Sequence, residues 1–255
     1  MRLIDSHCHL DLSAFDLDRD EVMQRARDKG VTDIIVPAVQ ATGWAKLHEI
    51  SRSHNPVNVH AAFGLHPVFE EYHEVNDLLL LEKQLNNESA IAVGECGLDF
   101  FIDQFDKAKQ LSFFTGQLDL AVQYQLPVII HSRKSLDLVL KELRLRPSLN
   151  GVVHSYSGSY QQAKQLIDLG FYLGFGGPIT YPRATKLRSL IVDLPLESLL
   201  LETDAPDQPD ISNHGQRNEP SWLNNIVSCV AGLRATSFEK VAEVTTKNSE
   251  QLFGL

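Results

Sequence analysis

Short apolar runs alternate with longer amphipathic stretches along the chain. The short runs are rich in Val, Ile and Leu without polar alternation, which is typical of strands buried on both faces. The longer stretches carry apolar residues three or four positions apart, which predicts helices with one buried face. The predicted strands span residues 3–9, 32–39, 57–63, 90–93, 128–130, 151–153, 171–175 and 199–201. The predicted helices span residues 18–29, 41–53, 75–85, 104–125, 135–144, 160–169, 183–192, 221–233 and 238–253.

These eight strand-then-helix units show no break in composition. Such alternation predicts the α/β class, with a parallel sheet covered by helices. Eight units in 255 residues favour a single (β/α)8 TIM-type barrel with an extra C-terminal helix, so residues 1–255 are predicted to form one domain. The pattern alone leaves a doubly wound open sheet as the alternative. At the last helix, Thr236 and Glu239 have the spacing of a capping box.

Composition places the chain among ordinary globular proteins, with 43% hydrophobic and 22% charged residues. Cys8, Cys96 and Cys229 are scattered and odd in number, so no disulfide framework is expected. The first predicted strand leaves no room for a signal peptide, and no run approaches the ~18 apolar residues of a membrane span. We therefore expect a cytoplasmic protein without a membrane partner, and nothing in the sequence indicates an obligate protein partner.

The net charge of −10 argues against a broad basic surface for nucleic acid. An anionic substrate would have to be attracted locally, by bound metal and a few arginines.

Residues of metal-ligand type recur where apolar runs stop. His7 and His9 follow Leu3 and Ile4, and residues two apart on a strand point to the same side. Imidazole is a common ligand for transition metals. An isolated His-x-His motif, however, is more often two histidines on a half-exposed strand that bind no metal. Four further residues lie at the ends of later predicted strands: Glu95, His131, His154 and Asp204. The carboxyl ends of barrel strands form one active-site face, so we expect the six side chains to converge.

Four histidines and two carboxylates exceed the usual ligand set of one tetrahedral zinc ion. We therefore expect two divalent cations per chain, as Mg, Mn or Zn. Glu95 is the expected bridge, because its strand lies between the strands of the other ligands. The expected sets are His7, His9, Glu95 and Asp204 for one ion, and Glu95, His131 and His154 for the other. The second ion has fewer protein ligands, so it should retain water and bind substrate.

The sequence closely resembles the TatD-type metal-dependent deoxyribonucleases, within the amidohydrolase-like barrels, and is most similar to their YjjV-like branch. The matching stretches are DSHCHLD (5–11), GLHP (64–67), GECGLD (94–99), HSR (131–133), HSYSG (154–158), ETDAP (202–206) and GQRNEP (215–220). The resemblance implies a TIM-type barrel and metal-dependent phosphoester hydrolysis, with 3′-to-5′ exonuclease activity on DNA known in the family. Its metal ligands fall on the six residues found above.

The chain departs from the family pattern at the substrate rim. Val68 follows Pro67 where the family often has His, and Asp207 replaces an aromatic residue after ETDAP. The usual FHCFSG reads VVHSYSG here. These differences concern the range of substrates rather than the ligands. The amidohydrolases that bridge their two metal ions with a carboxylated lysine are a poorer match, because the fourth predicted strand leads to Glu95.

The expected catalytic residues are Asp204 and Glu95. Asp204 would orient the attacking water and take its proton, while also binding metal. We expect His66, Arg133 and Arg217 to bind substrate, which would be DNA ends or short nucleotide phosphoesters. For each arginine the competing interpretation is a surface ion pair worth about 0–1 kcal/mol. Two alternative functions stay open: hydrolysis of a small amide, lactone or aminoacyl ester at the same site, and a non-enzymatic scaffold.

Overall fold

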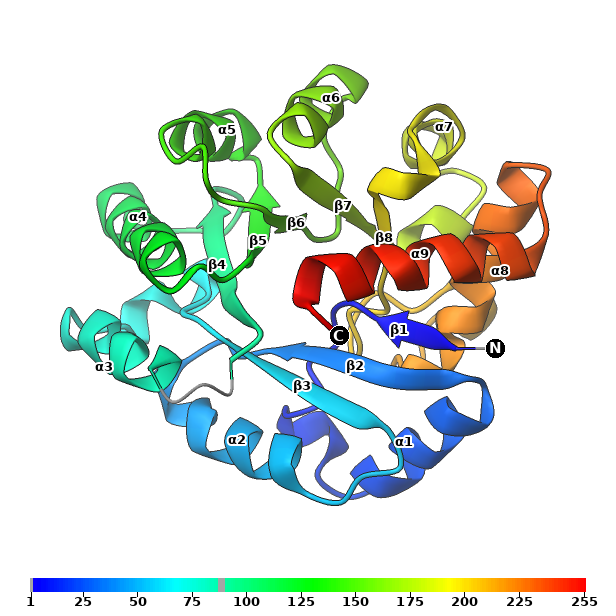
Figure 1. Ribbon diagram of the computed structural model, residues 1–255, viewed down its shortest axis with the longest axis horizontal. Coiled ribbons are helices and arrows are strands. Elements are labelled where there is room, and N and C mark those ends of the chain that lie inside the picture. Colours follow the sequence, from blue (N-terminus) through cyan, green and yellow to red (C-terminus); the bar gives the residue numbers. More distant parts are fainter. Residues whose placement is uncertain (1, 87–89) are drawn as a thin grey trace. The chain divides into compact units, whose positions relative to one another are not determined.

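The computed structural model describes residues 2–86 and 90–255 (Figure 1). The strands are β1 (Leu3–Asp5), β2 (Val31–Pro37), β3 (Asn58–Phe63), β4 (Ala92–Asp99), β5 (Val128–Arg133), β6 (Gly151–Val153), β7 (Phe171–Phe175) and β8 (Leu199–Leu201). The α-helices are α1 (Arg19–Asp28), α2 (Trp44–Arg52), α3 (Asn76–Leu85), α4 (Lys107–Tyr124), α5 (Leu136–Arg144), α6 (Tyr160–Asp168), α7 (Thr185–Asp193), α8 (Leu223–Leu233) and α9 (Phe238–Phe253). Seven short 3₁₀ helices lie in the described loops, among them η4 (Gly177–Thr180) and η6 (Ile211–Asn213).

The strands follow the order β1 to β8 in one sheet, and a helix follows each strand. Pairing is parallel, with registers such as Leu3 to Val31, Val128 to Gly151 and Leu173 to Leu199. Parallel strands in sequence order with intervening helices are the topology of a (β/α)8 barrel. The predicted fold class and the extra C-terminal helix, α9, are confirmed.

The described residues group into two compact units. Unit 1 comprises residues 2–36, 49–60 and 173–255, and unit 2 comprises residues 37–48, 61–86 and 90–172. The single-domain interpretation stays a prediction. No helix among the described residues combines the length and the apolar character that a membrane crossing requires.

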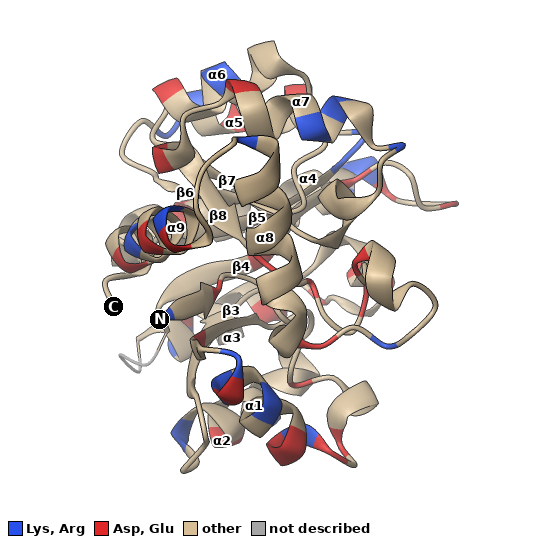
Figure 2. Ribbon diagram, turned by 90° about the vertical axis from the view of Figure 1, so that its right-hand side faces the viewer, with Lys and Arg blue, Asp and Glu red and all other residues tan. Residues whose placement is uncertain are grey.

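In unit 1, α9 packs against β1 and β8 (Figure 1, the red helix beside the blue strand). The Asn248 side-chain amide donates to the carbonyls of Leu196 and Leu199 at 2.9 and 2.8 Å, which ties α9 to the start of β8. The predicted capping box at Thr236 is wrong. Ser237 is the N-cap, because its hydroxyl accepts from the Lys240 amide at 3.1 Å. Figure 2 shows that α8 carries no charged residue, whereas α9 carries both signs.

In unit 2, two buried glutamines of α4 bind the backbone beside β3 and at the end of β4. Gln117 accepts from the Leu65 amide at 2.7 Å and donates to the Leu65 carbonyl at 3.1 Å. Gln110 accepts from the Asp99 amide at 2.9 Å and donates to the Asp99 carbonyl at 3.1 Å. Each buried amide is thus satisfied at both ends. These bonds tie α4 to the chain that follows β3 and to the end of β4, the strand that carries Glu95.

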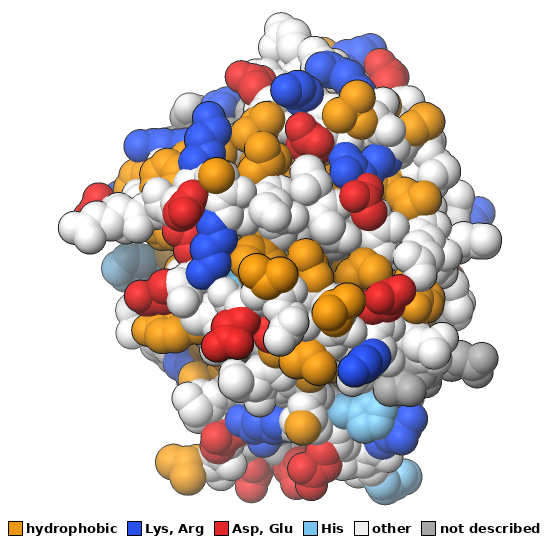
Figure 3. All heavy atoms as spheres, turned by 90° about the vertical axis from the view of Figure 1, so that its left-hand side faces the viewer, with side chains coloured by type: hydrophobic (Ala, Val, Ile, Leu, Met, Phe, Trp, Pro, Cys, Tyr) orange, Lys and Arg blue, Asp and Glu red, His pale blue; other side chains and the backbone are white. Residues whose placement is uncertain are grey.

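The outer face of α3 and α4 has mixed character. Leu79 and Leu80 of α3 are 57% and 45% exposed. Figure 3 shows this face, where hydrophobic side chains lie between acidic and basic ones. No broad basic surface is visible there, which agrees with the acidic net charge.

Two strand predictions need correction. The first strand was expected to run to residue 9, but β1 ends at Asp5. The chain then leaves the regular register with β2: the Cys8 amide still donates to Ile35 of β2 at 3.0 Å, but the His9 amide donates to Ala205 at 2.8 Å. The fourth strand was expected at 90–93, but β4 runs on to Asp99 through two glycines. Its final residues pair with β5, where a Cβ at Gly97 would lie 2.0 Å from the His131 oxygen, so only glycine fits this approach.

Candidate metal centre

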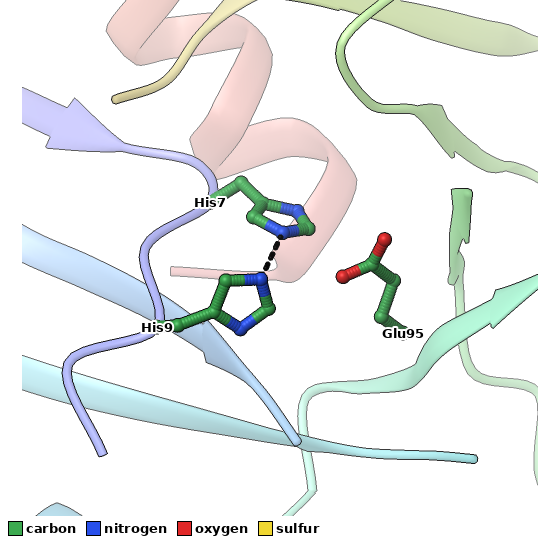
Figure 4. Close-up of side chains that lie close together, drawn as sticks. All are labelled: His7, His9 and Glu95. Carbon is green, nitrogen blue, oxygen red and sulfur yellow. Dashed lines mark hydrogen bonds between the residues drawn. The ribbon is translucent and has the colours of Figure 1, made fainter. Parts of the chain in front are cut away.

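In unit 1, three predicted ligands lie together. The Nε2 atoms of His7 and His9 are 3.2 Å apart, and Figure 4 shows both imidazoles projecting from the same side of the segment after β1. Asp204 places Oδ1 3.6 Å from each of these nitrogens. All three side chains are buried. Two imidazole nitrogens and a carboxylate oxygen that face one point form a donor set suited to a divalent transition metal.

Asp5 fixes the position of this group. Its carboxylate accepts from the Thr203 amide at 2.9 Å, from the Thr203 hydroxyl at 2.6 Å and from the His7 amide at 3.3 Å. The Asp204 amide in turn donates to the His7 carbonyl at 2.9 Å. Complete burial raises the pKa of Asp5 to about 7, although the Thr203 bonds oppose the shift. Asp5 was not among the predicted site residues. A carboxylate two positions before His7 was the available signal.

Asp204 has a left-handed backbone, with φ of 57°, a conformation that aspartate tolerates better than most residues. Gln208, four residues later, donates its side-chain amide to Asp204 Oδ2. One carboxylate oxygen therefore faces the two histidines while the other is held by an amide. No sequence signal marked Gln208, which lies in a polar loop.

In unit 2, three imidazoles surround one oxygen of Glu95. His66 Nε2, His131 Nδ1 and His154 Nε2 lie 3.0, 3.1 and 2.8 Å from Glu95 Oε1. Glu95 is 1% exposed. The ligand atoms of His66, Glu95 and His131 all lie within 4.8 Å of one another. Glu95 lies within β4. The shorter predicted strand, residues 90–93, had placed Glu95 beyond the end of the strand.

Asp99 orients His131. Its Oδ2 lies 2.9 Å from His131 Nε2. Burial works against ionisation of Asp99, yet the hydrogen bond from His131 leaves the pKa of this carboxyl below its usual value. An ionised Asp99 accepts from Nε2–H, so the Nδ1 lone pair of a neutral His131 faces Glu95 and is free to bind a cation. Burial opposes protonation of His131 as well, but its bonds to Asp99 and Glu95 raise its pKa overall. The carboxylates thus favour a positive charge at this position.

His66 differs from the other histidines of unit 2. Its Nδ1 accepts from the Val68 amide at 3.1 Å, so the proton of a neutral ring is on Nε2. This Nε2–H points at Glu95 Oε1. A protonated nitrogen cannot bind a metal, so His66 acts as a hydrogen-bond donor beside the ligand group. This geometry agrees with its omission from the predicted ligand set.

The two predicted arginines lie outside these groups. Arg217 makes a two-atom contact with Asp18, at 2.8 and 2.7 Å, and lies over the Phe15 ring. Arg133 is exposed, with its guanidinium 3.7 Å from the centre of the Phe101 ring. The ion pair of Arg217 fits the competing surface interpretation. A substrate-binding role for either arginine stays a prediction.

Comparisons with known proteins identify the family of the chain. The family model described as TatD related DNase matches residues 4–254. The metal-dependent hydrolase YjjV of Escherichia coli strain K12 is 42% identical over all of this chain and 98% of its own length. The metal-dependent hydrolase YabD of Bacillus subtilis is 33% identical over 98% of each chain. The crystal structure of YjjV superposes with a TM-score of 0.95 at 40% identity, covering 100% of this chain and 98% of that chain. The chain therefore belongs to the TatD family of metal-dependent hydrolases.

Proposed function

We propose that this protein hydrolyses phosphodiester bonds at DNA ends, as a 3′-to-5′ exodeoxyribonuclease that uses two divalent cations. The observation that carries the proposal is the approach of His131 and His154 to one buried oxygen of Glu95, with His66 as a hydrogen-bond donor beside them. A buried carboxylate with several imidazoles is the donor chemistry of a transition-metal site. The family model, described as a DNase, adds support for DNA as the substrate.

The six residues would bind the cations as predicted. His7, His9 and Asp204 would hold one ion, His131 and His154 the other, and Glu95 would bridge them. The donor set fits, because neutral imidazole nitrogens and carboxylate oxygens are what such ions bind. The abundance of imidazoles favours zinc over magnesium or manganese.

Divalent ions bound there would lower the pKa of a coordinated water, to about 7 for zinc, and so supply a hydroxide nucleophile at neutral pH. Asp204 would orient the attacking water and accept its proton through Oδ1, while Gln208 holds Oδ2. His66 would donate its Nε2–H to a phosphate oxygen or to the leaving oxygen. Asp99 would keep His131 in the tautomer that leaves Nδ1 unprotonated.

Arg133 would contact phosphate beyond the ligands. Its guanidinium stacks on Phe101, which restrains the side chain while its N–H groups stay exposed to solvent. We keep Arg217 as a second phosphate contact, which would require exchange of its Asp18 partner. Cys8, Cys96 and Cys229 are free thiols, which fits the proposed cytoplasmic location.

The second function to test is hydrolysis of a small amide, lactone or aminoacyl ester. The observation that favours it is the net charge of −10, together with the mixed character of the face in Figure 3. A small neutral substrate would need no basic surface.

The decisive experiment is hydrolysis of end-labelled single-stranded DNA by metal-stripped protein, with Mg, Mn or Zn added back. The wild type should shorten the strand from its 3′ end only with metal present, and both Asp204→Ala and Glu95→Ala should be inactive. Lactones and aminoacyl esters are assayed beside DNA. Their metal-dependent hydrolysis without any cleavage of DNA would replace the nuclease proposal with the second function.

A further inference from the structure

A pocket of about 400 Å³ lies in unit 1, beside the segment that follows β8. Its lining includes Tyr181, Arg183, Gln208, Pro209 and His214. Its volume falls within the ~300–1,000 Å³ typical of small-molecule sites. None of these residues belongs to the ligand groups described above.

The pocket wall is held by many short contacts. The Tyr181 hydroxyl donates to the Pro209 carbonyl at 3.0 Å, and the Ile211 amide donates to Thr180 Oγ1 at 2.9 Å. A Cβ added at Gly177 would lie 2.1 Å from the Gln208 carbonyl oxygen, so η4 approaches this loop as closely as glycine permits. The pocket is therefore preformed.

The lining combines aromatic rings with a single full charge. Tyr181 and His214 form an edge-to-face pair with centroids 6.0 Å apart. The Arg183 guanidinium lies 5.7 Å from the centre of the Tyr181 ring. Among the described residues, no carboxylate forms an ion pair with Arg183, which is exposed. An aromatic face beside an arginine without an acidic partner is suited to a nucleobase and its phosphate.

Gln208 links the pocket to the metal centre. The same side chain lines the pocket and donates to Asp204 Oδ2. The pocket is thus one side chain away from a residue of the proposed site.

We propose that this pocket binds one nucleotide unit of a single-stranded DNA substrate, with its base stacked on Tyr181 and its phosphate on Arg183. The inference rests on the proposed function and extends it, because it assigns the substrate contacts to a site apart from the metals. It also explains how an acidic protein would hold DNA, since Arg183 supplies positive charge locally.

The test is calorimetric binding of deoxyadenosine 5′-monophosphate and of deoxyadenosine to the metal-loaded protein. Tyr181→Ala should weaken both ligands about thirtyfold, the middle of the range for loss of one base–aromatic stack. Tyr181→Phe keeps the ring and loses only the bond to Pro209, so it should bind like the wild type. Arg183→Gln should weaken the monophosphate but not the nucleoside. Arg52→Gln, an exposed arginine of α2 outside the pocket, is the matched charge control and should change neither.

Unchanged monophosphate binding in Tyr181→Ala and Arg183→Gln would overturn the inference. Equal losses in Tyr181→Phe and Tyr181→Ala would also overturn it, because the ring would then act only through its hydroxyl. The DNA cleavage assay tests the proposed function separately. If the pocket variants still cleave DNA with unaltered KM, the nuclease proposal stands and the pocket proposal is refuted. If the protein cleaves no DNA but binds the nucleotide through the pocket residues, the pocket proposal stands and the nuclease proposal is refuted.

Discussion

At the scale of single residues, hydrogen bonds decide which histidines can bind metal. His131 and His66 both contact Glu95 Oε1, but their outer nitrogens have opposite partners. Asp99 accepts from His131, whereas the Val68 amide donates to His66. The first arrangement presents a lone pair to the site and the second presents a proton.

This difference predicts separate effects on metal content and on rate. His66→Ala should reduce kcat by about 10²-fold or more, because a positioned proton donor contributes roughly 10²–10⁴-fold. His66→Gln, which can place an N–H near the same position, should retain more of the rate. Elemental analysis should find the wild-type metal content in both variants. Loss of metal in His66→Gln would instead show that His66 is a ligand.

Asp33 of β2 predicts how stability depends on pH. Burial opposes its ionisation, but bonds from His60, Thr32, Asn58 and Arg2 hold its pKa well below the usual range. The folded pKa lies below the unfolded value of about 3.9, so the stabilisation is complete above about pH 4 and is lost as the pH falls toward the folded pKa. Asp33→Asn should lower the free energy of unfolding by about 1–3 kcal/mol at neutral pH.

Urea unfolding of the wild type and of Asp33→Asn, from neutral to acid pH, measures the free energy of unfolding of each protein. The difference between them should be constant above about pH 5 and should shrink below pH 4. Asp168→Asn, at an exposed position of α6, is the matched control. A difference that grew as the pH fell would refute the assignment.

At the scale of elements, the approach of β4 to β5 determines where Glu95 lies. The register places Gly97 opposite His131 and Asp99 opposite Arg133. The missing Cβ of Gly97 allows both strands to carry site residues at this distance. The buried glutamines of α4 then hold the end of β4.

Gly97→Ala should therefore destabilise the protein by at least about 1–3 kcal/mol, because the new methyl group overpacks a backbone contact. Metal binding should weaken with it, since the His131 backbone must move. Gly232→Ala in α8 is the matched control: nothing lies within 4 Å of its added Cβ, so it should stabilise by about 0.5–1 kcal/mol. Denaturant midpoints with metal titrations measure both. Equal stabilities for the two variants would contradict the strand-approach argument.

At the scale of the whole molecule, metal binding should stabilise the fold. Ions that bind only the folded state at 100 times their Kd would add about 2.7 kcal/mol, or roughly 5–10 °C in Tm for a chain of this size. Metal-stripped protein should regain this increase when Zn or Mn is added back. Glu95→Gln keeps the side-chain shape and removes the charge, so its Tm should respond much less. The same Tm increase in Glu95→Gln would place the stabilising ion elsewhere.

Periodicity predicted the elements well where packing follows local pattern. Strands β6, β7 and β8 and helix α9 begin and end where the apolar runs predicted. It failed where backbone bonds depend on distant partners. β1 ends early because the chain after it loses its register with β2 and the His9 amide donates to Ala205 instead. The N-cap of α9 is Ser237 rather than Thr236, because the Ser237 hydroxyl accepts from the Lys240 amide.

The sequence by itself determined the α/β class and the identity of the six ligand-type residues, whereas the strand order came from the structure. The class and the ligand-type residues follow from periods of hydrophobicity and from residue chemistry at strand ends, which are local properties. Only the tertiary structure decided which atom of each residue faces its neighbours in the two donor groups. The tautomers of His66 and His131 depend on Val68 and Asp99, and the position of Asp204 depends on Gln208. The pocket at Tyr181 and Arg183 likewise exists only because the loops after β7 and β8 fold together, and no sequence period encodes such contacts.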